Sequence, residues 1–144
     1  MTAKQYLQSY KRLETRYIAI VEQLKSIENE TISLKSPTFD ERVTSSPKKD
    51  PIGEMVCVLE KEKGTLGIRL TETKAKMAVI RNQISKLEEV DNEYYTVLLF
   101  RYILYKDWKF ICDSLHLSRA QANVIHGRAL LEFDNKFSMF YGDR

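Results

Sequence analysis

The residues best suited to chemistry lie near the C-terminus, between residues 114 and 131. This stretch carries Arg119, Arg128 and His126 and no acidic residue, whereas the 144-residue chain as a whole has 23 basic and 20 acidic residues. Arginine can donate two hydrogen bonds to guanine, and asparagine, which occurs here as Asn123, can pair in the same way with adenine. A cationic stretch without carboxylates fits an anionic partner. These residues therefore predict an interaction with DNA.

Metal binding and catalysis have weaker support in the sequence. Cys112 and His116 are four positions apart and His126 lies ten further on, but a zinc site needs a fourth ligand and usually has paired ligand spacing. The chain has no glycine-rich phosphate loop, no nucleophile elbow and no paired acid–base constellation. We expect no metal, no cofactor and no enzymatic activity, with Cys112 in the core and His116 in a turn.

Helical periodicity places the cationic stretch in the last of three short helices. Their expected ranges are 92–104, 108–115 and 118–136. Asp91 and Asp107 can cap the first two, and Ser118 with Gln121 forms a capping-box pattern at the start of the third. The spacing of the last two helices is that of a helix-turn-helix. Histidine, found in the turn as His116, is one of the side chains enriched in the left-handed backbone that this turn often needs.

In a helix-turn-helix the second helix enters the major groove of DNA. With Ala122, Ile125, Ala129 and Phe133 facing inward, the residues expected to contact DNA lie at the helix start and on the opposite face. They are Ser118, Arg119, Ala120, Gln121, Asn123, Val124, Gly127 and Arg128, with Lys109 of the preceding helix. Arg119, Asn123 and Val124 would meet base edges, and the other cations would hold phosphates. The alternative is that Arg119 and Arg128 are ordinary solvated charges.

Two long heptad patterns fill the first two thirds of the chain. The first consists of Tyr6, Tyr10, Leu13, Tyr17, Ile20, Leu24, Ile27, Thr31 and Leu34. The second consists of Ile52, Val56, Leu59, Lys63, Leu66, Leu70, Thr73, Met77, Ile80, Ile84 and Leu87. Alternating steps of three and four residues predict helices that pack along one face. Gly64 and Gly67 predict a kink or a close helix crossing in the second helix.

These patterns predict an all-α fold, in which a long antiparallel helical hairpin precedes a small three-helix helix-turn-helix domain. Residues 1–90 would form the hairpin, with a linker at about 35–50 that contains Pro37 and Pro47. Residues 91–137 would form the helix-turn-helix, and residues 138–144 a tail. The heptad faces pair either within one chain or between chains. We expect a homo-oligomer, a dimer or higher, because a single helix-turn-helix makes few base contacts.

The segment from Tyr94 to Phe133 resembles region 4 of bacterial sigma-70 factors. The likeness is carried by residues 97–102, by Trp108 to Cys112 with Leu115, and by residues 117–119 and 125–130. Over nearly its whole length the chain is similar to a family of short proteins of phages and prophages of Gram-positive bacteria. The start at residues 1–7 and the linker at 42–47 also fit that family. The resemblance implies a phage transcription regulator, and Leu104-Tyr105 departs from it where a turn with glycine is expected.

The function expected from these features is that of a DNA-binding transcriptional regulator. The recognition helix, about residues 118–131, would lie in the major groove of double-stranded DNA, and the N-terminal helices would oligomerise. The alternative is a helical adaptor that binds RNA polymerase or another protein without touching DNA. Cys57 and Cys112 are expected to be reduced and buried in a cytoplasmic protein of the bacterial host cell. We expect no contact with membranes, because no apolar run is long enough to cross one.

Overall fold

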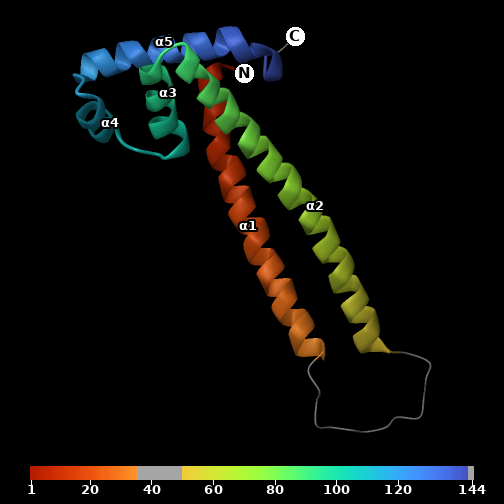
Figure 1. The fold of residues 1–144 in the computed structure, drawn as a ribbon. Helices are drawn as coiled ribbons and strands as arrows, with labels where there is room; N and C mark the ends of the chain where they lie inside the picture. Colours follow the sequence, from red (N-terminus) through yellow and green to blue (C-terminus); the bar gives the residue numbers. More distant parts are fainter. Residues whose placement is uncertain (36–49, 143–144) are drawn as a thin grey trace. The chain divides into compact units, whose positions relative to one another are not determined.

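The computed structural model describes residues 1–35 and 50–142, and these residues contain helices and no strand. The prediction of an all-α fold is confirmed. The two long helices are α1 (Ala3–Lys35) and α2 (Pro51–Lys86), shown in Figure 1. The shorter helical elements are η1 (Leu87–Glu89), α3 (Asn92–Leu98), η2 (Leu99–Ile103), α4 (Trp108–Leu115), α5 (Arg119–Phe137) and η3 (Ser138–Phe140). The linker predicted at about 35–50 lies almost entirely outside the described residues.

The chain divides into two compact units. Unit 1 combines Met1–Thr15 with Lys74–Arg144, and unit 2 is Arg16–Thr73. The start of α1 and the end of α2 therefore belong to the same unit as the C-terminal helices. The division into a hairpin, a helix-turn-helix domain and a tail remains a prediction. Among the described residues, no helix combines the length and the apolar composition that crossing a membrane requires.

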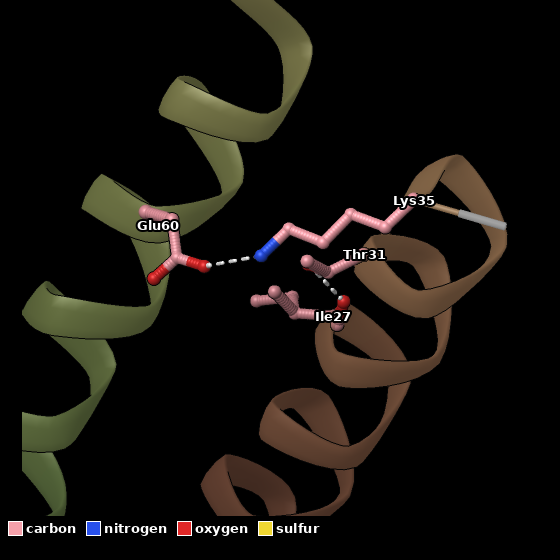
Figure 2. Close-up of polar contacts among 4 residues, drawn as sticks. All are labelled: Ile27, Thr31, Lys35 and Glu60. Atoms are coloured by element: carbon pink, nitrogen blue, oxygen red, sulfur yellow. Dashed lines mark hydrogen bonds and ion pairs between the residues drawn. The ribbon is translucent and has the colours of Figure 1, made fainter. Parts of the chain in front are cut away.

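Unit 2 is held together by one apolar cluster between α1 and α2. Ile20 and Ile27 of α1 pack with Leu59 and Leu66 of α2, and all four are at most 6% exposed. At one end of the unit the Lys35 ammonium lies 3.9 Å from the Glu60 carboxylate, as Figure 2 shows. Both partners of that ion pair are more than half exposed, so apolar burial contributes most of the stability here.

The predicted heptad faces agree with the observed burial at most positions. Every predicted member of the α1 face is buried or half-buried, whereas Ile52 and Lys63 of the α2 face are exposed. Neither Gly64 nor Gly67 has a neighbouring atom within 4 Å of the position a Cβ would occupy. None of the described helices crosses closely at these glycines, and α2 continues through them without interruption.

The core of unit 1 gathers side chains from the first turns of α1, the end of α2 and the C-terminal helices. Its largest fully buried side chains are Phe133, Leu7, Ile84, Leu87, Leu98, Ile111 and Val97. The two long helices are antiparallel here, because Tyr6 bonds to Gln83 whereas Tyr10 bonds to Arg81. The Tyr6 hydroxyl donates to Gln83 Oε1 at 2.9 Å, and Arg81 donates to the Tyr10 hydroxyl at the same distance.

The apolar C-terminal segment docks in part on this core. Phe137 is buried, and the Tyr141 ring stacks on Tyr6 with 4.5 Å between centroids, while its hydroxyl donates to Asp134 at 2.7 Å. Met139, in contrast, is 71% exposed. Phe137 and Tyr141 therefore dock on the core of unit 1, whereas the Met139 side chain does not.

Within residues 1–35 and 50–142, two non-glycine residues adopt left-handed backbone, and both lie just after helical segments. His116 closes α4 with φ 56° and ψ 43°, and the following Leu117 N–H donates to the Cys112 carbonyl at 2.9 Å. The prediction of a left-handed turn with histidine is confirmed. Tyr105, with φ 56°, occupies the place where the sigma-like pattern has a turn with glycine. A tyrosine therefore takes the conformation for which glycine was expected.

Replacing His116 with glycine is expected to raise the free energy of unfolding by up to about 1 kcal/mol, because glycine adopts left-handed backbone without the steric cost of a Cβ. His116 is exposed, so the substitution removes no buried contact. Urea unfolding followed by circular dichroism measures the change. Equal or lower stability of the glycine variant would show that the turn stores no strain at this residue.

Candidate nucleic-acid interface

The start of α5 is fixed by the predicted capping box. The Ser118 hydroxyl accepts from the Gln121 N–H at 3.1 Å, and Gln121 Oε1 accepts from the Ser118 N–H at 2.9 Å. Each side chain thus satisfies a backbone donor of the other residue, which sets the direction in which α5 begins. Asp107 is the N-cap of α4, and its carboxylate accepts from the Phe110 N–H at 2.8 Å. Both helices on either side of the His116 turn therefore have sharply defined N-terminal ends.

All nine residues predicted to contact DNA are exposed. They are Lys109, Ser118, Arg119, Ala120, Gln121, Asn123, Val124, Gly127 and Arg128. On the other side of α5, Ala122, Ala129 and Phe133 are fully buried and Ile125 is half-buried, as the inward face requires. Apart from Gly127, the two residues beside it and the nearby backbone of α5, no described atom lies within 4 Å of the position of a Gly127 Cβ, so the backbone there is accessible to a large partner. The exposed residues lie on one side and at the start of α5 and, for Lys109, on α4.

The arginine at the helix start is positioned by an aromatic ring. The Arg119 guanidinium carbon lies 4.4 Å from the centre of the Trp108 ring, and Arg101 approaches the same ring at 5.2 Å. In the described part of the chain, the Arg119 guanidinium makes no hydrogen bond or ion pair. Stacking on tryptophan limits the motion of the guanidinium plane and leaves its N–H donors available to a ligand.

The half-buried His126 packs against the Trp108 ring that both arginines contact. His126 Nε2 is 2.8 Å from the Tyr102 hydroxyl, and its ring meets Trp108 edge to face at 5.0 Å. Burial, followed by the positive charges of Lys4, Arg101 and Arg119, lowers the pKa of His126 to about 4. Burial also raises the pKa of Tyr102 to about 12. At neutral pH the phenol therefore keeps its proton and the imidazole is uncharged, and the imidazole tautomer sets which of the two donates in this hydrogen bond.

Acidification is expected to destabilise the protein through His126. Its pKa lies at about 4 in the folded chain and at 6.5 when unperturbed, so the unfolded chain binds the proton first as the pH falls. The contribution of the uncharged His126 to the free energy of unfolding is fully present above pH 6.5 and is lost as the pH falls towards 4. Water screens the half-exposed ring, so we expect a loss of about 1–2 kcal/mol.

Urea unfolding at pH 7.5 and 4.5 tests this linkage, with His126→Gln as the non-titrating comparison. Glutamine offers both a donor and an acceptor to the Tyr102 hydroxyl and does not titrate. It also removes the ring contacts with Trp108 and Tyr102, so the two proteins are compared by their change in stability between the two pH values. The wild type should lose more stability than the variant over this interval. Parallel losses in the two proteins would assign the pH dependence to other groups.

A shallow apolar hollow lies on the candidate DNA-contacting surface. Its volume is about 450 Å³, and it is lined by Glu93, Leu117, Ala120, Gln121, Val124, Ile125 and Arg128. Val124 is 52% exposed, and Leu131, further along the same side of α5, is 63% exposed. A thymine methyl group or an apolar side chain of another protein could occupy such a surface. The sequence indicated Val124 but not the hollow around it.

A second, larger hollow has a basic lining. Its volume is about 780 Å³, and it is lined by Gln8, Lys11, Arg12, Thr15, Arg101, Tyr102 and Tyr105. The sequence did not indicate these residues as a site. The adjacent cations Lys11 and Arg12 are visible in the sequence, but no local pattern links them to Arg101, which lies some ninety positions further along the chain.

The cysteines and the ligand-type side chains form no cluster. Among residues 1–35 and 50–142, no three His, Cys, Asp or Glu side chains gather as a metal site would require. Cys112 is half-buried, but Cys57 is exposed and both thiols are free. The expectation of a buried Cys57 is wrong, because its position on α2 lies outside the apolar face that packs against α1.

No protein-family model, no curated protein and no solved structure matches this chain. The resemblance to region 4 of sigma-70 factors and to the phage proteins therefore rests on the sequence features alone. It remains an expectation about function.

Proposed function

We propose that the protein is a DNA-binding transcriptional regulator of phage or prophage genes. The single observation that carries the proposal is the outer side of α5, where all the predicted contact residues are exposed. Its start is fixed by the capping box of Ser118 and Gln121, and the preceding turn has the left-handed residue typical of a helix-turn-helix. The side chain of Arg119 is held on Trp108 with its donors available. Such a helix fits the major groove.

In the proposed complex these residues form two groups, one that contacts base edges and one that binds phosphates. Arg119 and Asn123 would hydrogen-bond base edges, and Val124 would contact a thymine methyl. Arg128 and Lys109 would bind phosphates, which fix the position of the protein on the duplex without specifying sequence. The charge pattern supports this division, because residues 114–131 include no carboxylate that would repel DNA.

We also propose that residues 1–90 bring two or more copies together. Large apolar side chains remain exposed on the long helices of unit 2, namely Ile18, Ile32, Ile52, Met55, Val58 and Ile68. An oligomer would cover such side chains and would present two recognition helices to two half-sites. Light scattering over a range of concentrations tests this, and a monomer at every concentration would contradict it.

Selection of bound sequences from a random duplex library tests the DNA-binding proposal directly. Enrichment of a defined motif, followed by a gel-shift assay with that motif and with a scrambled duplex, would support sequence-specific binding. Failure to enrich any motif, together with equal affinity for both duplexes, would contradict it. Sequencing of DNA recovered with the protein from induced lysogens would identify the natural sites.

A protein-binding adaptor is the second candidate, and the apolar hollow around Val124 favours it. A partner such as RNA polymerase could insert an apolar side chain there. A salt series separates the two functions. Affinity for DNA falls steeply with salt because bound counterions are released, whereas affinity through an apolar surface changes little.

A further inference from the structure

The basic hollow of unit 1 has the size and chemistry of a phosphate-binding site. Its volume of about 780 Å³ is larger than one phosphate needs and lies within the usual range of ligand sites. Three lining residues, Lys11, Arg12 and Arg101, carry positive charge at neutral pH. Gln8 adds amide N–H donors to the lining, whereas the Thr15 hydroxyl donates to the Lys11 carbonyl at 3.0 Å. The hollow therefore combines cations with neutral donors, as anion sites do.

The positive charge of the hollow is not neutralised within the described chain. No carboxylate of the described residues lies within ion-pair distance of Lys11, Arg12 or Arg101. The nearby Glu14 accepts a hydrogen bond from the Tyr105 hydroxyl at 2.6 Å, which occupies one of its oxygens. An anion entering the hollow would thus meet more positive than negative charge.

The cations are partly fixed in place before any ligand binds. The Lys11 ammonium lies 5.7 Å from the centre of the Tyr105 ring, and Tyr105 itself is held in left-handed backbone. Arg101 donates to the Lys106 carbonyl at 3.4 Å and stacks on Trp108. Strained backbone at such a position is a feature of functional sites. A preformed arrangement lowers the entropy cost of binding.

Arg101 connects the hollow to the proposed recognition helix. Its guanidinium and that of Arg119 approach the same Trp108 ring, at 5.2 Å and 4.4 Å. Each DNA strand carries one charge per roughly 3.4 Å of helix axis, so a strand contacted at Arg119 brings further phosphates close to Arg101. The hollow is open along the surface, which suits a continuous strand better than a small enclosed ligand.

We propose that this hollow binds backbone phosphates of the DNA duplex whose major groove α5 reads. It would extend the contact with DNA from α5 to the first turns of α1. This inference rests on the proposed function. It adds Lys11, Arg12 and Arg101 to the interface as phosphate-binding residues that carry no base preference.

The test compares the double variant Lys11→Gln/Arg12→Gln with the wild type in DNA binding at several salt concentrations. Losing two phosphate contacts should reduce the slope of log K against log salt by about 1.8 and weaken binding about tenfold near physiological salt. The ranking of preferred sequences should stay the same. Lys61→Gln/Arg69→Gln, which removes the same charge from exposed residues of unit 2 that lie outside the heptad face, is the matched control and should keep the wild-type slope.

Three other results would contradict this inference, and one of them would also contradict the proposed function. Each gives a different experimental pattern. An unchanged slope in a folded Lys11/Arg12 variant, with sequence-specific binding intact in the wild type, overturns this inference alone. Absence of DNA binding by the wild type overturns the proposed function and, with it, the assignment of DNA phosphates to the hollow. Tight calorimetric binding of inorganic pyrophosphate that DNA does not displace assigns the hollow to small phosphorylated molecules, which also overturns the DNA assignment.

Discussion

Replacing Phe133 with alanine is expected to lower the free energy of unfolding by about 3–5 kcal/mol, because the truncation removes a buried ring and leaves a cavity. Phe133 is completely buried on the inner side of α5. Its ring centre lies 4.9 Å from that of Phe137, 6.0 Å from that of Tyr6 and 6.2 Å from that of Tyr141. The substitution therefore weakens the contact of α5 with α1 and with the C-terminal segment together.

Urea unfolding followed by far-ultraviolet circular dichroism measures this loss. Phe140→Ala is the matched control, because it removes the same ring from a side chain that is 58% exposed. We expect the control to change stability by less than about 0.5 kcal/mol. Similar losses in both variants would mean that Phe133 does not hold the core of unit 1.

Helix positions and caps could be predicted because they depend on neighbours in the sequence. The capping box at Ser118, the cap at Asp107 and the left-handed His116 all involve residues at most a few positions apart. The same is true of the inward face of α5, which follows from helical spacing once Phe133 is assumed to be buried. These local features also fixed which side of α5 is exposed, and hence the candidate contact residues.

Burial at the start of α1 was only partly predicted, because helices distant in the sequence cover side chains there. Ala3 and Leu7 are buried, although neither belongs to the heptad face. A heptad pattern describes a helix with one partner. Near its N-terminus α1 also meets the C-terminal helices within unit 1, as the contact of Tyr6 with Phe133 demonstrates. The C-terminal helices cover α1 positions that lie beside the heptad face. The periodicity of α1 alone does not indicate this second contact.

The basic hollow could not be predicted for a related reason. Lys11 and Arg101 meet only because the first turns of α1 and η2 fold into the same unit. The sigma-like pattern has a turn with glycine at Leu104-Tyr105, but tyrosine itself has no preference for left-handed backbone and did not indicate that the turn is kept. Contacts among distant residues and conformations imposed by tertiary packing are the features that spacing and composition do not encode. The candidate interface was therefore predicted on α5 and missed on α1.

Replacing Arg119 or Asn123 with alanine is expected to cost about 1–3 kcal/mol of DNA-binding free energy each, or roughly 5- to 150-fold in affinity, and to relax base preference. Both side chains are exposed, and neither substitution removes a buried contact. Arg119 does pack on Trp108, so the stability of that variant must be measured alongside its affinity. Repeating the library selection with each variant reports which base position loses its preference.

Arg128→Ala provides the contrast within the same helix. Arg128 is exposed on the same side of α5, and a phosphate contact made by it should affect all sequences equally. We expect its loss to weaken binding uniformly and to reduce the salt slope by about 1, with the selected motif unchanged. A motif that survives unaltered in an Arg119→Ala/Asn123→Ala double variant would show that α5 does not read bases, and would leave the adaptor function as the better explanation of this surface.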